Sequence, residues 1–158
     1  MKIIDYKDID FVNYKLPSLY IIMPYCSFKC DKECGRNVCQ NSPLAKAATH
    51  NITVSELIKK FDSLQPLVKA VVFGGLEPFD SGDEFYCFVS AFRYLHPHPI
   101  VIYTGYTEDE VHEKFKWIYN FKNIIIKYGR FIPDQESHYD EVLGVRLASP
   151  NQYAKENK

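Results

Sequence analysis

Four short apolar runs alternate along the chain with stretches that have helical spacing. The runs cover 18–23, 70–73, 100–103 and 123–126 and are apolar on both faces, as is typical of strands buried in a parallel sheet. In the intervals between them, apolar residues recur every three or four positions, which predicts one helix in each interval. The alternation of strands and helices predicts an α/β fold with a parallel sheet.

Capping boxes of the form S/T-x-x-E mark the expected starts of the helices. The pairs are Thr53 with Glu56, Ser81 with Glu84, and Thr107 with Glu110. We expect the third helix to continue far enough to bury Phe115 and Ile118 on its inner face. The residues after about Asp134 are polar and lack clear periodicity, so we expect a flap or a partner-binding segment there.

Four strands and three helices are too few to close an eight-stranded barrel. They predict a partial, open parallel β/α barrel or a small doubly wound sheet. We expect one domain over residues 1–158, with its core at about 18–132 and a C-terminal tail at 133–158.

Glycines follow three of the expected strands, and the segment after the first strand contains cysteines. Ligands bind at the carboxyl edge of parallel sheets, where loops are free of structural duty. We therefore expect one ligand-binding edge formed by the cysteine segment together with Gly74, Gly75, Gly105 and Gly129.

Charge and hydropathy exclude two classes of partner. The 19 basic and 20 acidic residues leave a formal charge of −1 without a basic run, which argues against a nucleic-acid partner. The apolar runs are far shorter than the ~20 residues of a membrane span. Lys2 and Asp5 place charges where a signal peptide has its apolar core. We expect a cytoplasmic protein that does not bind a membrane.

Cysteine placement points to a metal site. Cys26, Cys30, Cys34 and Cys39 fall in one short segment, while Cys87 stands alone in an expected helix. In a reducing cytosol such a cluster favours metal binding over disulfides. The spacings differ from the C-x2-C pairs of common zinc modules. From spacing alone, an iron–sulfur cluster, a zinc site and free or redox-active thiols all remain open.

The start of this segment resembles the signature of the radical S-adenosylmethionine superfamily, C-x3-C-x-φ-C, in which φ is apolar or aromatic. Cys26 and Cys30 match its first half directly after the first strand. Family members commonly carry Asn two residues beyond the last cluster cysteine, and Cys39, Gln40 and Asn41 match that feature. More narrowly, the chain resembles the activating proteins of anaerobic ribonucleotide reductases, which are glycyl-radical-enzyme activases.

The resemblance implies that Cys26, Cys30 and Cys39 hold the cluster, with Val38 as φ. Cys34 then lies in an inserted loop and is the alternative third ligand. This assignment departs from the family, because eight residues rather than two separate the second and third ligands. Val38, Gln40 and Asn41 are expected near the cofactors.

Two later segments add to the resemblance. Residues 74–78, Gly-Gly-Leu-Glu-Pro, resemble the family's G-G-E-P segment with one inserted leucine. This implies that Gly74, Gly75 and Glu77 hold the amino group of S-adenosylmethionine. Residues 103–106, Tyr-Thr-Gly-Tyr, match a segment of glycyl-radical activases and imply that Thr104 contacts the ribose or carboxylate. Weaker similarity is found at 129–132 and 146–152.

The resemblance implies a radical S-adenosylmethionine fold of the partial-barrel type and two cofactors, a [4Fe–4S] cluster and S-adenosyl-L-methionine. Three thiolates leave one iron open, and in the family reduction of the cluster cleaves the sulfonium to methionine and a 5′-deoxyadenosyl radical. The implied partners are the large subunit of anaerobic ribonucleotide reductase, on which a glycyl radical forms, and a reductant such as flavodoxin. Two alternatives are a radical enzyme acting on a small metabolite and a non-enzymatic zinc module using all four clustered cysteines.

Overall fold

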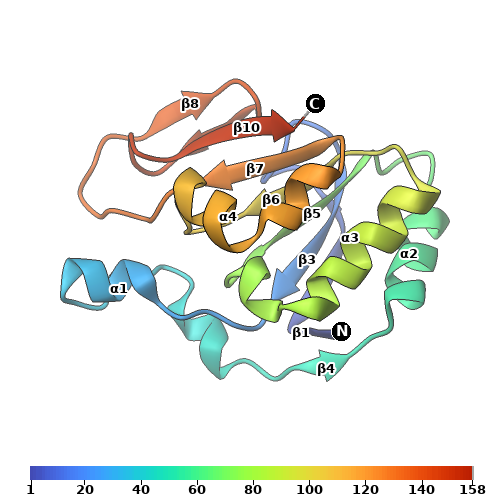
Figure 1. Cartoon of the computed structure of the whole chain (residues 1–158), viewed down its shortest axis with the longest axis horizontal. Helices are drawn as coiled ribbons and strands as arrows, with labels where there is room; N and C mark the ends of the chain where they lie inside the picture. The colour runs from blue at the N-terminus through green and yellow to red at the C-terminus, as the bar shows by residue number, and fades with distance from the viewer. Residues whose placement is uncertain (158) are drawn as a thin grey trace.

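A six-stranded sheet forms the centre of the protein, and its four middle strands are parallel (Figure 1). The computed structural model describes residues 1–157. Across the sheet the order is β10-β7-β6-β5-β3-β2, and the two edge strands are antiparallel to their neighbours. The bounds are β2 Asp5–Asp10, β3 Ser18–Met23, β5 Ala70–Gly75, β6 Ile100–Tyr103, β7 Ile124–Tyr128 and β10 Tyr153–Asn157.

The expected α/β class and the parallel core are confirmed, since β3, β5, β6 and β7 coincide with the four apolar runs. Both edge strands were missed because they are rich in charged residues, as exposed sheet edges usually are. The sheet is open and mixed, and its continuation toward a barrel stays a prediction.

The C-terminal tail has more structure than its polar sequence predicts. It forms a hairpin of β8 (His138–Asp140) and β9 (Val145–Leu147) and then joins the central sheet as β10. A second small pairing joins β1 (Lys2–Ile3) to β4 (His50–Asn51). Long-range pairing thus supplies order that the local periodicity does not show, and the role of this segment as a flap or partner-binding segment stays a prediction.

Three α-helices cover one face of the sheet. Leu57 of α2 (Val54–Ser63), Phe88 of α3 (Asp83–Leu95) and Val111 of α4 (Glu108–Lys114) share one core with the strand residues facing them. This one-sided packing excludes a doubly wound sheet, which has helices on both faces. Within residues 1–157, no helix combines the length and apolar character needed to cross a membrane.

The other face of the sheet carries no helix. Tyr14, from the loop before β3, and Leu143 and Leu147, from the β8–β9 hairpin, pack there against Val72 and Val101. Because side chains alternate between the two faces of a strand, the residues next to Val72 and Val101 belong to the helical core. The helix-free face therefore has a thin cover of loops and a hairpin.

Two of the three predicted capping boxes are confirmed, at Thr53 and at Thr107. The one at Ser81 is wrong. Gly82 is the N-cap of α3, and Ser81 ends the 3-10 helix η2 (Pro78–Ser81). Glu84, the second residue of the predicted box, instead accepts a hydrogen bond from the backbone N–H of Lys2.

The third helix is shorter than predicted. Helix α4 ends at Lys114, since Phe115 has non-helical dihedral angles, and a 3-10 helix, η3 (Lys116–Asn120), follows. Ile118 is nevertheless buried in the helical core, as its apolar character predicts.

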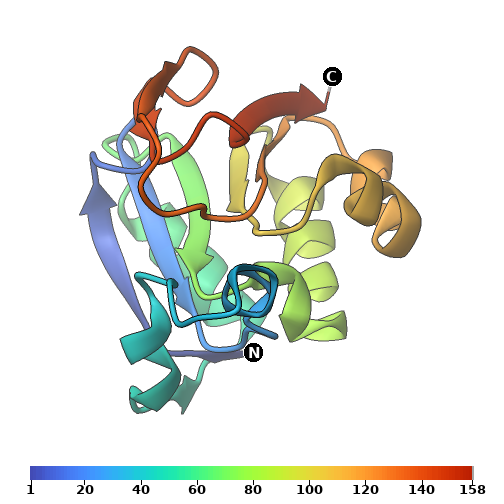
Figure 2. The same ribbon diagram turned by 90° about the vertical axis from the view of Figure 1, so that its left-hand side faces the viewer.

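The carboxyl ends of the parallel strands form the edge that matters for function. The chain leaves β3 at this edge and enters a short helix, α1 (Lys29–Cys34), and then the 3-10 helix η1 (Ser42–Lys46). Figure 2 looks toward this edge, with α1 in front of the strand ends and the β8–β9 hairpin above.

Candidate metal centre

A cavity of about 330 Å³ opens at the carboxyl edge of the sheet, on its helix-free face. That volume lies within the usual range for small-molecule sites. Most residues predicted to form the site line this cavity, namely Cys26, Cys30, Cys39, Gln40, Asn41, Gly74, Gly75, Glu77 and Thr104. The cysteine segment and the loops after β5 and β6, which are far apart in sequence, thus meet as predicted from strand polarity.

Cys26, Cys30 and Cys39 contribute thiols to the cavity wall. The Sγ atom of Cys26 accepts a hydrogen bond of 3.2 Å from the backbone N–H of Phe28. Burial raises the pKa of Cys26 to about 12 and also raises the pKa of Cys30. The metal-free thiols of Cys26 and Cys30 are therefore protonated at neutral pH, and a metal that binds them must displace their protons.

Cys34 does not line the cavity. It ends α1 and is half-buried, and the backbone turns away after it at Gly35. The cavity wall therefore includes three of the four clustered cysteines. Within residues 1–157, no three Cys, His, Asp or Glu side chains are already grouped as a single-ion site.

Asp31 explains how Cys39 reaches the cavity despite the long spacing. One oxygen of its carboxylate accepts hydrogen bonds of 2.8 Å from the backbone N–H groups of both Val38 and Cys39. These bonds fold the inserted residues back against α1. Val38 itself does not line the cavity, so its predicted contact with a cofactor stays a prediction.

Asn41 joins the cysteine segment to the end of β5. Its side-chain Nδ2 donates a 2.7 Å hydrogen bond to the carbonyl oxygen of Gly75. The inserted Leu76 is accommodated in the same junction, because its N–H bonds to Met23 and the N–H of Glu77 bonds to Tyr25. The two predicted motifs are therefore physically connected.

Glu77 fastens the loops around the cavity. Its buried carboxylate accepts hydrogen bonds from the Thr104 hydroxyl, from the backbone N–H of Gly105 and from the backbone N–H of Phe79. Burial raises the pKa of Glu77 to about 7. The Thr104 hydroxyl also accepts a bond from the N–H of Tyr106. Glu77 and Thr104 line the cavity as predicted, but in this conformation their polar atoms bind protein groups.

We expect Glu77→Gln to remove a pH dependence of stability. Folding raises the pKa of Glu77 from 4.5 to about 7, so between these values the folded chain binds more protons than the unfolded chain. The free energy of unfolding therefore falls as the pH rises through this window, by up to about 3 kcal/mol. Urea unfolding of the metal-free protein and the variant at both ends of the window measures this. If the free energies of unfolding of the two proteins differed by the same amount at both pH values, the prediction would be contradicted.

Lys127 is a site residue that the sequence prediction missed. It is buried near the end of β7, lines the cavity, and donates a 3.0 Å hydrogen bond to the carbonyl oxygen of Gly129. Burial lowers its pKa to about 8, so the ammonium group is still mostly charged at neutral pH. The sequence feature that could have identified it is a lysine near the end of an apolar strand. A charged side chain that is buried needs a partner, so its position in a buried strand indicates a function.

Gly129 is fixed by a close backbone approach. Its φ is +97°, and a Cβ atom would lie 2.7 Å from the backbone oxygen of Asn151. We expect Gly129→Ala to lower the free energy of unfolding by about 2–4 kcal/mol. Gly35→Ala is the matched control, because φ there is +67° and nothing lies within 4 Å of the added atom. Its expected cost is about 1 kcal/mol. If urea unfolding showed that both variants lose the same free energy of unfolding, the close approach at Gly129 would not explain the cost.

Comparison with known proteins gives one family. The model described as "4Fe-4S single cluster domain" matches residues 18–152, from the first residue of β3 to the residue before β10. This range contains the four clustered cysteines and all other residues that line the cavity except Asn13. No curated protein and no solved structure matches the chain at a significant level.

Proposed function

The chain belongs to the family of 4Fe–4S single cluster domains, which is typical of radical S-adenosylmethionine activases, and from this we propose its chemistry. Cys26, Cys30 and Cys39 hold a [4Fe–4S] cluster, and S-adenosylmethionine binds beside it in the cavity. The observation that carries the proposal is that Cys39 lies on the cavity wall with Cys26 and Cys30, while Cys34 does not.

The residues present suit such a group. Cysteine thiolates are the usual ligands of iron–sulfur clusters, and the cavity wall offers three cysteines. Lys127 and Arg130 are close enough to Cys30 to favour its thiolate. When bound, a three-thiolate cluster supplies an open iron and the electron that cleaves the sulfonium of S-adenosylmethionine into methionine and a 5′-deoxyadenosyl radical.

The protein's own groups position the substrate. The Lys127 ammonium pairs with the carboxylate of S-adenosylmethionine, because it is the buried cation on the cavity wall. Gly74 and Gly75 lack side chains and let the ligand approach the end of β5 closely. Glu77 and Thr104 bind each other, so we assign them to shaping the cavity rather than to holding the ligand.

The substrate of the radical is proposed to be a backbone glycine on the large subunit of an anaerobic ribonucleotide reductase. The hydrogen atom taken from that glycine forms 5′-deoxyadenosine and leaves a glycyl radical. The support is the similarity of residues 103–106 to glycyl-radical activases and their position on and beside the cavity wall. A reductant such as flavodoxin would supply the electron.

Anaerobic purification tests the cofactor. The proposal predicts a brown protein with about four iron and four sulfide per chain after reconstitution. Zinc without iron or sulfide would indicate the zinc module instead. A glycyl-radical spectrum on a candidate reductase subunit, dependent on S-adenosylmethionine and reductant, tests the substrate. Cleavage of S-adenosylmethionine coupled to a small metabolite, with no radical on the subunit, would indicate the metabolite enzyme.

A further inference from the structure

Helix α1 carries Cys30 but has little stability of its own. It is 6 residues long, its N-cap Phe28 makes no side-chain capping bond, and none of its residues is buried. Isolated helices shorter than ~12 residues are marginal in water. Contacts from outside the helix must therefore hold it in front of the strand ends, where Figure 1 shows it standing apart from the other helices.

Ion pairs from two other elements reach α1. Arg130, which follows β7, donates two hydrogen bonds to Glu110 of α4, at 2.6 and 2.7 Å. On its other side, Arg130 Nε lies 2.7 Å from Glu33 Oε1 of α1, as an ion pair without a well-directed hydrogen bond. Lys29 of α1 lies 3.2 Å from Glu110. The side chain of Arg130 is only 8% exposed and that of Glu110 23%, so the pair between them is largely shielded from water, whereas Glu33 is 60% exposed.

The same arginine contacts the backbone of Gly105, which lies close to the Cys30 side chain. Its Nη1 atom donates a 2.6 Å hydrogen bond to the carbonyl oxygen of Gly105. A Cβ atom on Gly105 would lie 3.8 Å from Cys30 Sγ, which shows how closely the two segments approach. Lys29 adds a cation–π contact, with its Nζ atom 4.1 Å from the ring centre of Tyr106.

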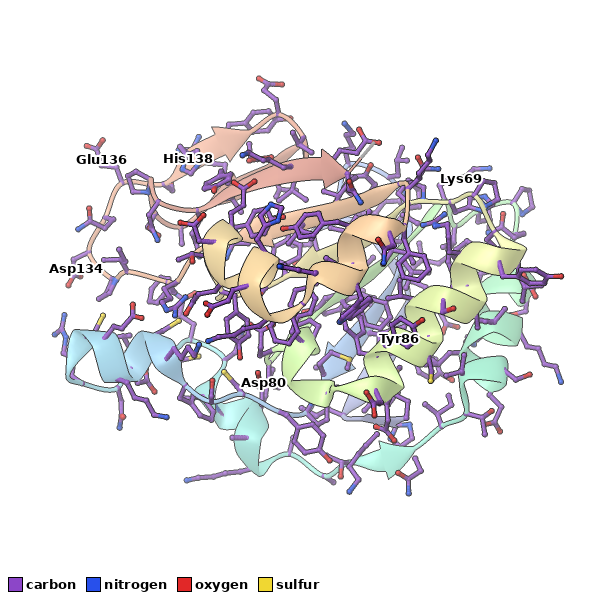
Figure 3. The ribbon with its side chains drawn as sticks, in the orientation of Figure 1. Lys69, Asp80, Tyr86, Asp134, Glu136 and His138 are labelled. Carbon is purple, nitrogen blue, oxygen red and sulfur yellow. The ribbon has the colours of Figure 1, made fainter. Side chains whose placement is uncertain are left out.

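A second ion pair, Arg36 with Asp134 at 3.3 Å, also links the inserted loop to the segment after β7. Figure 3 shows Asp134 on the loop that faces α1. Both side chains of this pair are largely exposed, and exposed pairs contribute little. The contacts of the buried Arg130 side chain are therefore the stronger anchor on this side of α1.

We propose that Arg130 is a positioning residue that, through Glu110, Glu33 and Lys29, holds α1 and thereby Cys30 against the cavity. Its consequence for cluster loading rests on the proposed function, but its effect on the metal-free chain does not. Sequence similarity at 129–132 gave no role for this side chain. Its geometry assigns one.

The reactivity of individual cysteines in the metal-free protein tests this. N-ethylmaleimide labelling followed by mass spectrometry gives a rate for each cysteine. We expect Arg130→Met to speed labelling of Cys30 about tenfold, because local opening exposes the thiol and relieves the burial that raises its pKa, which outweighs the loss of the guanidinium charge that favours the thiolate. Cys26, held through Ser27 by Asp80, and the exposed Cys87 should keep their rates.

A second variant guards against general misfolding, because Arg130→Met leaves Glu110 without its main partner. Lys29→Met with Glu33→Gln removes the two charges of α1 that pair with Glu110 and Arg130, and leaves the Arg130–Glu110 pair intact. We expect the same selective rise at Cys30. Glu108→Gln is the matched control, since Glu108 also lies on α4 but pairs with Lys155 of β10 and not with α1.

The outcomes separate the two proposals. A Cys30 rate that stays unchanged relative to Cys26 in the double variant overturns the positioning role, as does an equal rise at all cysteines. Selective labelling together with a wild-type chain that binds no iron supports the role and overturns the proposed function. Iron loading that falls in Arg130→Met and not in Glu108→Gln supports both.

Discussion

Replacing Cys39 with Ala should abolish iron binding, whereas replacing Cys34 with Ala should leave about four iron per chain. Cys39 lies on the cavity wall with Cys26 and Cys30, and Cys34 lies off it at the end of α1. Two remaining thiolates do not hold a cubane that needs three protein ligands. The measurement is iron and sulfide per chain after anaerobic reconstitution.

Asp31→Ala sharpens this comparison without changing a thiol. The variant removes both hydrogen bonds that fold Cys39 back toward the cavity. If Cys39 is the third ligand, iron loading at limiting iron should fall well below that of the wild type. Retained iron in Cys39→Ala, together with loss in Cys34→Ala, would show that the shorter spacing supplies the third ligand and would overturn our assignment.

Lys127→Met should weaken binding of S-adenosylmethionine about 10- to 100-fold, the usual cost of losing a hydrogen bond to a charged group. Methionine has a similar length and suits the buried position, so the fold and the cluster should persist. Equilibrium dialysis with the cluster-loaded protein measures the affinity, at iron contents matched to the wild type.

Lys155→Met is the control for this effect. Lys155 lies on the neighbouring strand β10, opposite Ile126, but it is exposed and pairs with Glu108. We expect its affinity for S-adenosylmethionine to equal that of the wild type. Equal affinities in all three proteins would show that Lys127 does not face the ligand's carboxylate.

The buried parts of the fold were predictable from the sequence. Each parallel strand is an apolar run, and burial on both faces is a local property that the sequence shows directly. Strand polarity then placed the glycine loops and the cysteine segment at one edge. The edge strands β2 and β10 were not predictable in this way, because pairing with a distant strand orders their polar residues.

Within the site, residue identity was easier to predict than residue role. Asn41 and Gly75 were expected near each other and are joined by a hydrogen bond. Glu77 and Thr104 were predicted to contact the ligand, but their side chains bind each other. The sequence does not show this bond, because it depends on the close approach of two loops. Asp31 and Arg130 had no predicted role, because only the folded chain brings them to their partners.

The central claim is that a three-thiolate cluster in this cavity cleaves S-adenosylmethionine. The most direct measurement is the amount of methionine and 5′-deoxyadenosine formed when the reconstituted, reduced protein is incubated anaerobically with S-adenosylmethionine. We predict equal amounts of the two products with the wild type and none with Cys39→Ala. A cluster-loaded, reduced wild-type protein that leaves S-adenosylmethionine intact would contradict the claim.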